Sequence, residues 1–193
     1  MVKKSVSKDS DVKKKPARSK EIKKPADKKT GIAKDASVEE IAVKVRDMFN
    51  VAVKKFEAAV QKREAGESDA SDFDEPLKLL DEVIEIMPEY RSAINYKGMM
   101  LVNLGEHQKA IECFDMMLKI NPKDKEALNN KGIVLYGLGR DEEALKFIDQ
   151  AIALDKRYSD ALMNKAVILH GLGMEEEARK CILRANVLDK LNS

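Results

Sequence analysis

The sequence predicts an all-α fold in which helix pairs stack into a solenoid. Residues 91–124, 125–158 and 159–192 repeat one another with a period of 34 residues, which is typical of stacked helical repeats. The chain has 36% charged residues and no tryptophan, which suits an elongated stack better than one large core. Each unit contains two amphipathic stretches separated by one glycine, at Gly105, Gly139 and Gly173.

The N-terminal segment, residues 1–36, differs in charge from the rest of the chain. It carries 13 basic and 5 acidic residues, a net charge of +8, whereas the other 157 residues carry 23 basic and 29 acidic residues, a net charge of −6. Its low hydrophobicity predicts a disordered tail. Such a tail can contact nucleic acid or another polyanion by charge alone, although it lacks aromatic residues that stack on bases. The simpler alternative is a solubilising linker.

Residues 37–90 predict a long helix followed by an irregular first repeat. Ser37 and Glu40 form a capping-box pattern, and apolar residues spaced by three or four continue from Ile41 to Val60. We therefore expect one helix over about 38–65. The stripe on its first half needs cover, either from the following helices or from a second chain. The second alternative predicts a homodimer through residues 37–60.

The small and acidic segment 66–74 predicts a loop. We expect Asp74 to cap a second helix that has Pro76 in its first turn and ends before Pro88. From Gly66 to Pro88 the chain spans 22 residues, against 17 in the equivalent part of the next unit, so this turn contains five extra residues.

The same residue types recur in phase when Arg91, Lys125 and Ser159 are counted as position 1. Small residues occupy positions 8 and 20, and large apolar residues occupy position 24. In order these are Gly98, Gly132 and Ala166; Ala110, Ala144 and Ala178; and Phe114, Ile148 and Ile182.

Over about residues 50–193 this pattern resembles the tetratricopeptide repeat (TPR) family. The resemblance implies a right-handed superhelix of antiparallel helix pairs, with repeats at 91–124, 125–158 and 159–193. Positions 4 and 11 depart from the family, because Leu or Ile stands where Trp and Tyr are favoured. Such apolar exchanges keep the core.

The last repeat differs from the others at two positions. Positions 21 and 28 are apolar in the earlier units, for example Ile111 and Leu118, but they are Arg179 and Asn186 in the last one. We infer that both positions face the next repeat. We therefore expect the last unit to have a polar outer face that caps the array at its C-terminal side.

In TPR proteins the first helices of the units line a concave groove, and the resemblance implies a peptide-binding groove here. Met99, Ile133 and Val167 would form an apolar strip, and the carboxamides of Asn130 and Asn164 can bond to a peptide backbone. The alternative is that these side chains serve local packing alone. The expected groove residues are Asn95, Met99, Asn129, Asn130, Ile133, Tyr136, Met163, Asn164, Val167 and His170.

Two further patterns bear on the partner. Some TPR proteins clamp a terminal carboxylate with basic residues, but position 2 here is Ser92, Glu126 and Asp160, so we expect no such clamp. Position 7 is lysine in every regular unit. These lysines either lie along apolar surface with the ammonium in water or form a ladder for an acidic ligand: Lys97, Lys131 and Lys165.

No motif indicates catalysis. His107 and His170 lie in different parts of their units, and Cys113 and Cys181 lie two periods apart, too far to pair in a stack. We expect a non-catalytic protein–protein interaction scaffold with no metal and no cofactor. We also expect a cytoplasmic protein, because no signal peptide or transmembrane segment is evident. The alternative is a nucleic-acid-associated adaptor that uses residues 1–36.

Overall fold

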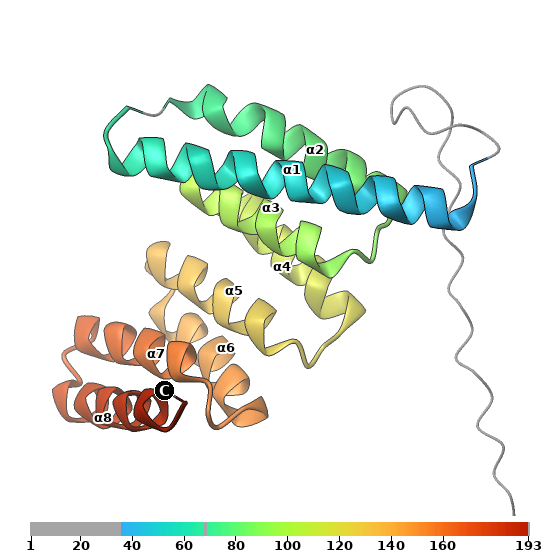
Figure 1. Cartoon of the computed structure of the whole chain (residues 1–193). Coiled ribbons are helices and arrows are strands. Elements are labelled where there is room, and N and C mark those ends of the chain that lie inside the picture. Colours follow the sequence, from blue (N-terminus) through green and yellow to red (C-terminus); the bar gives the residue numbers. More distant parts are fainter. Residues whose placement is uncertain (1–35, 68, 193) are drawn as a thin grey trace, which may run out of the picture.

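The computed structural model describes residues 36–67 and 69–192, so the predicted tail lies outside the described residues, apart from Ala36. The described residues form helices and no strand, which confirms the all-α solenoid (Figure 1). Successive helices pair and the pairs stack in chain order. The elements are α1 (Val38–Glu64), η1 (Ala70–Phe73), α2 (Asp74–Ile86), α3 (Arg91–Asn103), α4 (His107–Ile120), α5 (Lys125–Gly137), α6 (Asp141–Leu154), α7 (Ser159–Gly171) and α8 (Glu175–Asn192).

The start of α1 follows the predicted capping box. The Ser37 hydroxyl accepts a hydrogen bond from the backbone N–H of Glu40 at 3.2 Å, and the Glu40 carboxylate accepts one from the backbone N–H of Ser37 at 2.7 Å. The helix ends at Glu64, one residue before the predicted end.

The apolar stripe on the first half of α1 is covered within the chain. Ile41 and Val45 are buried, and the ring of Phe49 packs edge-on against the rings of Tyr90 and Tyr96 at 5.3 and 5.5 Å between centroids. The following helices therefore supply the cover that we expected either from them or from a second chain.

The turn between α1 and α2 is partly helical. The 3₁₀ helix η1 buries Phe73 against the ring of Phe56, with 6.1 Å between the centroids. Asp69 caps η1 by accepting a hydrogen bond from the backbone N–H of Ser71, and Asp74 is the first residue of α2. The loop predicted over 66–74 therefore contains a short 3₁₀ helix, and the predicted cap at Asp74 was wrong, because the N-cap residue of α2 is Phe73. The extra residues of this turn bring a large ring into the core.

Each joint between successive repeats contains one lysine–aspartate ion pair. The lysine comes from position 7 of a first helix and the aspartate from position 25 of the preceding second helix. The pairs are Lys97–Asp81 at 2.5 Å, Lys131–Asp115 at 2.6 Å and Lys165–Asp149 at 2.6 Å. These lysines hold neighbouring repeats together, so they are engaged within the stack rather than arranged as a ladder for an acidic ligand.

The outer face of α8 differs from the prediction. Arg179 and Asn186 are exposed, as expected. However, Leu183, Val187 and Leu191 on the same helix are also exposed, by 66%, 58% and 69%. This face is therefore apolar over its second half, where we predicted a polar cap.

Neither a membrane-spanning helix nor a metal-binding cluster is found in the part of the chain that the structure describes. Across residues 36–67 and 69–192, none of the helices combines the length and the hydrophobicity needed to cross a bilayer. Over the same residues no group of three or more His, Cys, Asp or Glu side chains is placed to hold a metal ion.

Candidate peptide-binding groove

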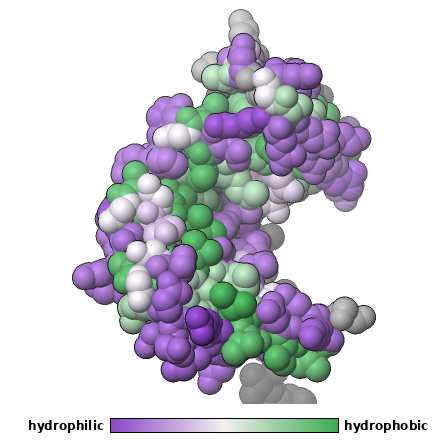
Figure 2. Space-filling model, turned by 90° about the vertical axis from the view of Figure 1, so that its left-hand side faces the viewer, coloured by the Kyte–Doolittle hydropathy of each residue, from purple (hydrophilic) through white to green (hydrophobic). Residues whose placement is uncertain are grey.

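The stack forms a crescent that is hollowed on one side (Figure 2). The hollow opens toward the viewer of Figure 1, where α3 and α5 lie in front of their partner helices. The first helices of the repeats therefore line the concave side, as the family resemblance implied. The turns that return the chain from α3, α5 and α7 to the back layer contain the predicted glycines, whose φ angles are 77°, 72° and 74° at Gly105, Gly139 and Gly173.

Position 9 forms an apolar strip along the concave side. Met99, Ile133 and Val167 come from three successive repeats and are exposed by 39%, 38% and 53%. Met163, which lies one turn before Val167 on α7, is also exposed, by 39%. Large apolar side chains exposed at equivalent positions of successive repeats form a continuous surface, and such surfaces mark interaction sites.

The groove asparagines pair across the joints between repeats. The amide N–H of Asn130 donates to the side-chain oxygen of Asn95 at 2.9 Å, and the amide N–H of Asn164 donates to the side-chain oxygen of Asn129 at 3.0 Å. Both bonds join position 5 of one repeat to position 6 of the next. Because each amide uses only one of its two N–H groups in this bond, Asn130 and Asn164 keep polar atoms for a partner.

Asn129 is not a groove contact. Its side chain is 3% exposed, and its oxygen is bonded to Asn164. Asn95 is half-buried, and its amide nitrogen lies 3.8 Å from the sulfur of Met99. The expectation that all of the groove asparagines face a ligand is therefore wrong for Asn129. This residue fixes the position of Asn164 instead.

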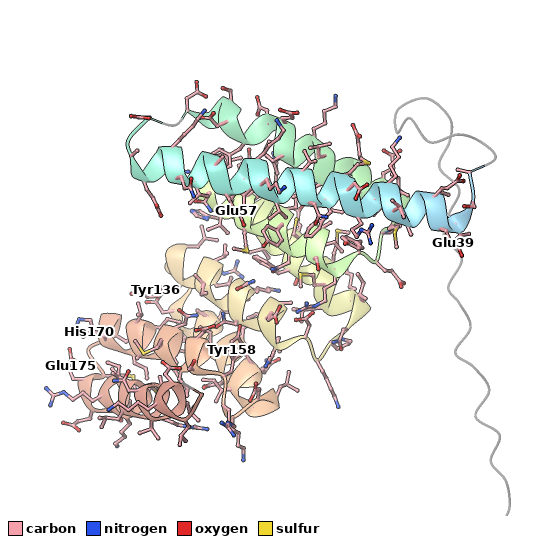
Figure 3. The ribbon with its side chains drawn as sticks, viewed as in Figure 1. Glu39, Glu57, Tyr136, Tyr158, His170 and Glu175 are labelled. Carbon is pink, nitrogen blue, oxygen red and sulfur yellow. The ribbon has the colours of Figure 1, made fainter. Side chains whose placement is uncertain are left out.

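Tyr136 and His170 stand near the C-terminal ends of α5 and α7, at the left-hand edge of the molecule in Figure 3, where Glu175 is also labelled. The Tyr136 hydroxyl lies against Gly171 of the next repeat, where a Cβ would approach it to 2.6 Å. His170 is highly exposed, and its Nδ1 lies 2.9 Å from a carboxylate oxygen of Glu175. Glu175 was not among the predicted groove residues, because it belongs to the second helix of its repeat, α8. The turn between α7 and α8 places it beside His170.

An ionic cluster links α3 to the start of α5, between two successive repeats. The Arg91 guanidinium binds the carboxylate of Asp124 through two nitrogens and that of Glu126 at 2.5 Å. Burial alone would raise the pKa of Asp124, but the hydrogen bonds from Arg91 and from the backbone N–H of Ala127 outweigh it and hold this pKa below its ordinary value. Glu126, at position 2, is thus neutralised by an arginine of the preceding repeat.

The family models match the repeats in phase with the predicted boundaries. Models described as tetratricopeptide repeat match residues 92–124, 125–158 and 159–190, which together are about half of the chain. The chain belongs to the tetratricopeptide repeat family. The resemblance found in the sequence is thereby confirmed. A search of curated proteins finds no match to this TPR chain.

Solved structures of MamA share the fold of this TPR protein. MamA from Desulfovibrio magneticus RS-1, residue 41 to the end, is 14% identical, with a TM-score of 0.56 over 78% of this chain and 86% of that one. A structure of MamA MSR-1 is 22% identical, with a TM-score of 0.54 over 78% of this chain and 98% of that one. At these identities the likeness is one of fold.

Proposed function

We propose that the chain is a non-catalytic scaffold that binds an extended segment of a partner protein in the concave groove. The apolar strip of Met99, Ile133 and Val167 carries this proposal, because it exposes large side chains along the hollow of the crescent. A partner that alternates apolar and polar residues would place apolar side chains on this strip. The amides of Asn130 and Asn164 stand beside the strip and can bond to the partner's backbone.

The charges of the groove favour an internal segment over a chain terminus. Glu126 and Asp160 occupy position 2, where binding of a terminal carboxylate would need basic groups. The nearest guanidinium, that of Arg91, is already bonded to Asp124 and Glu126. A partner's C-terminal carboxylate would therefore find no free cation at position 2, and the carboxylate of Asp160 there would repel it. A neutral or basic segment meets no such repulsion.

Selection from a phage-displayed library of random peptides against the full chain tests the proposal. The affinity of a selected peptide is then measured by fluorescence anisotropy for Ile133→Glu, which puts a charge in the centre of the strip. We expect the affinity to fall by about tenfold or more. Ile120→Glu on α4 is the matched control, since Ile120 is exposed by 39% and Ile133 by 38%. This control should bind as the unaltered chain does.

Two outcomes would count against the groove. The selection can yield no peptide with a measurable affinity, or the Ile133→Glu variant can bind as tightly as the Ile120→Glu control. Because both isoleucines are exposed to the same extent, a loss of folding does not explain a difference between the two variants. Helix content measured by circular dichroism checks this directly.

The charge of residues 1–36 favours a second candidate function, that of an adaptor associated with nucleic acid. Their net charge of +8 would bind a phosphate backbone with a strong dependence on salt. Salt titration of DNA binding by the full chain and by residues 37–193 tests this. Equal binding by both would rule the tail out.

A further inference from the structure

The last helix exposes an apolar face to solvent. Leu183, Val187 and Leu191 follow one another at every fourth residue of α8, and Ile182 beside them is 37% exposed. In the earlier repeats the equivalents of Ile182 are Phe114 and Ile148, whose exposed fractions are only 1% and 0%. Hydrophobic surface gathers at the lower end of the crescent, where α7 and α8 lie (Figure 2). We call Ile182, Leu183, Val187 and Leu191 the α8 face.

The opposite end of the stack also exposes apolar side chains. Val43 and Val51 of α1 are exposed by 47% and 44%, and with the half-buried Met48 and Leu79 they line a surface cavity of about 730 Å³. We call these four residues the α1 face, although Leu79 comes from the neighbouring helix α2. They are distinct from the stripe of Ile41, Val45 and Phe49, which is covered within the chain.

Neither end of the stack carries the ion-pair residues of an internal joint. Every internal joint pairs an aspartate at position 25 with a lysine at position 7, as in Asp115–Lys131. At position 25 of the last repeat stands Leu183. Counted back from Gly66 as Lys97 is from Gly105, position 7 of the first repeat is Ala58. Both members of the ion pair are therefore replaced by apolar residues, one at each end of the stack.

The charges around the two faces are opposite in sign. The residues that line the cavity of the α1 face include three carboxylates, Glu39, Glu40 and Asp47, and one lysine. Around the α8 face, from residue 179 to residue 191, α8 carries four basic residues and one acidic residue, Asp189, whereas its three glutamates stand in the first turn, before the face begins. Contact between unlike faces brings opposite charges together, whereas contact between two copies of the same face brings like charges together.

We propose that the α8 face of one copy packs on the α1 face of a second copy, so that copies join end to end. The contact differs from an internal joint, where position 21 and position 28, such as Ile111 and Leu118, pack in the core shared with the next repeat. In the last repeat these positions are the exposed Arg179 and Asn186, which lie beside the α8 face. Such a contact is heterologous, so each assembly keeps one unused face at either end and grows by addition of copies. The proposal does not depend on the groove.

Sedimentation velocity of the full chain over a series of concentrations tests the proposal. The weight-average mass is expected to rise above that of the monomer as concentration increases. Leu183→Glu/Val187→Glu removes the α8 face and Val43→Glu/Val51→Glu removes the α1 face, and each variant alone should stay monomeric. An equimolar mixture of the two retains one intact face of each kind. The mixture should form a dimer of one copy of each and nothing larger.

Each alternative arrangement gives a different result and would overturn the proposal. Dimers of Val43→Glu/Val51→Glu alone would mean that two α8 faces pair with each other. Dimers of Leu183→Glu/Val187→Glu alone would mean that two α1 faces pair. A monomer at every concentration of the unaltered chain would mean that these faces do not associate.

A groove variant controls for the added charge. Val167 is 53% exposed, which is close to the 58% of Val187, and it lies in the groove rather than at an end of the stack. Val167→Glu should associate as the unaltered chain does. Loss of association in this variant would assign the contact to the groove and contradict the proposal. All five substituted residues are exposed, and circular dichroism confirms that the variants keep their helices.

Discussion

Gly132 of α5 lies against Ile148 of α6 so closely that a Cβ on Gly132 would come 2.5 Å from Ile148 Cγ1. The carbonyl oxygen of Ala144 would be 3.1 Å away. Ile148 is fully buried, and its branched stem and the helix backbone beside it have little room to move. The close approach of α5 and α6 therefore depends on the absence of a side chain at position 8.

Replacing this glycine should loosen the repeat. We expect Gly132→Ala to lower the free energy of unfolding by about 1–2 kcal/mol, because the strain of about 1–3 kcal/mol from overpacking exceeds the gain of up to about 1 kcal/mol in helix propensity. Urea denaturation followed by circular dichroism measures the change. Gly137→Ala in the same helix is the control. No neighbouring atom lies within 4 Å of a Cβ there.

The control should behave in the opposite way. Gly137→Ala should raise the free energy of unfolding by about 0.5–1 kcal/mol, since it restricts the unfolded chain without a clash in the folded one. If both alanine variants are stabilised alike, the contact between Gly132 and Ile148 does not limit how closely the two helices pack.

The ion pair between Lys131 and Asp115 should contribute more than an exposed pair does. The Lys131 side chain is only 13% exposed, and its Nζ also lies 4.3 Å from the centroid of the Phe147 ring. We expect a double-mutant cycle with Lys131→Ala and Asp115→Ala to give a coupling of about 0.5–1 kcal/mol, because Asp115 itself is partly solvated.

The exposed pair Lys109–Glu106, at 2.5 Å, provides the comparison. Its side chains are 67% and 40% exposed, so its coupling should be smaller and should vanish first as salt is added. Equal coupling energies for the two pairs at high salt would show that the burial of Lys131 between two repeats does not strengthen its ion pair.

The sequence predicted those features that depend on one repeat alone. The turn glycines follow from the spacing within a unit, and the structure places them as predicted. Pairings across a joint were not predicted. Asn129 was expected to face a ligand, but the next repeat brings Asn164 to it, and this neighbour is visible only in the stacked arrangement.

The character of the two ends of the stack was also not predicted from the repeat pattern. Arg179 and Asn186 indicated a polar face on the last repeat, but the positions of Leu183 and Val187 on the helix surface decide the character of that face. These positions carry charged or small residues in the earlier repeats, so the repeat pattern does not indicate an apolar face there. In the first repeat, the buried Phe73 stands at position 17, where the regular repeats carry His107, Asp141 and Glu175, so the repeat pattern does not indicate a large apolar residue there.

Asp124 combines two roles that a single substitution can separate. Its side chain is 2% exposed, caps α5 through the backbone N–H groups of Glu126 and Ala127, and binds Arg91. Asparagine can also cap a helix, so Asp124→Asn keeps the cap and removes the charge. We expect this variant to lose about 1–2 kcal/mol of unfolding free energy at pH 7, because a charge-assisted hydrogen bond is lost.

The pH dependence of this loss follows from the lowered pKa of Asp124. A carboxylate whose pKa is lower in the folded state stabilises the fold above its unfolded pKa of about 3.9, and this contribution disappears as the pH falls through the folded pKa. The difference between the unaltered chain and Asp124→Asn should thus be constant above about pH 5 and should close below about pH 4. Urea denaturation at a series of pH values measures it. A difference that persists unchanged at the lowest pH would mean that the Asp124 charge contributes nothing through Arg91, and that the substitution acts through the cap or through packing.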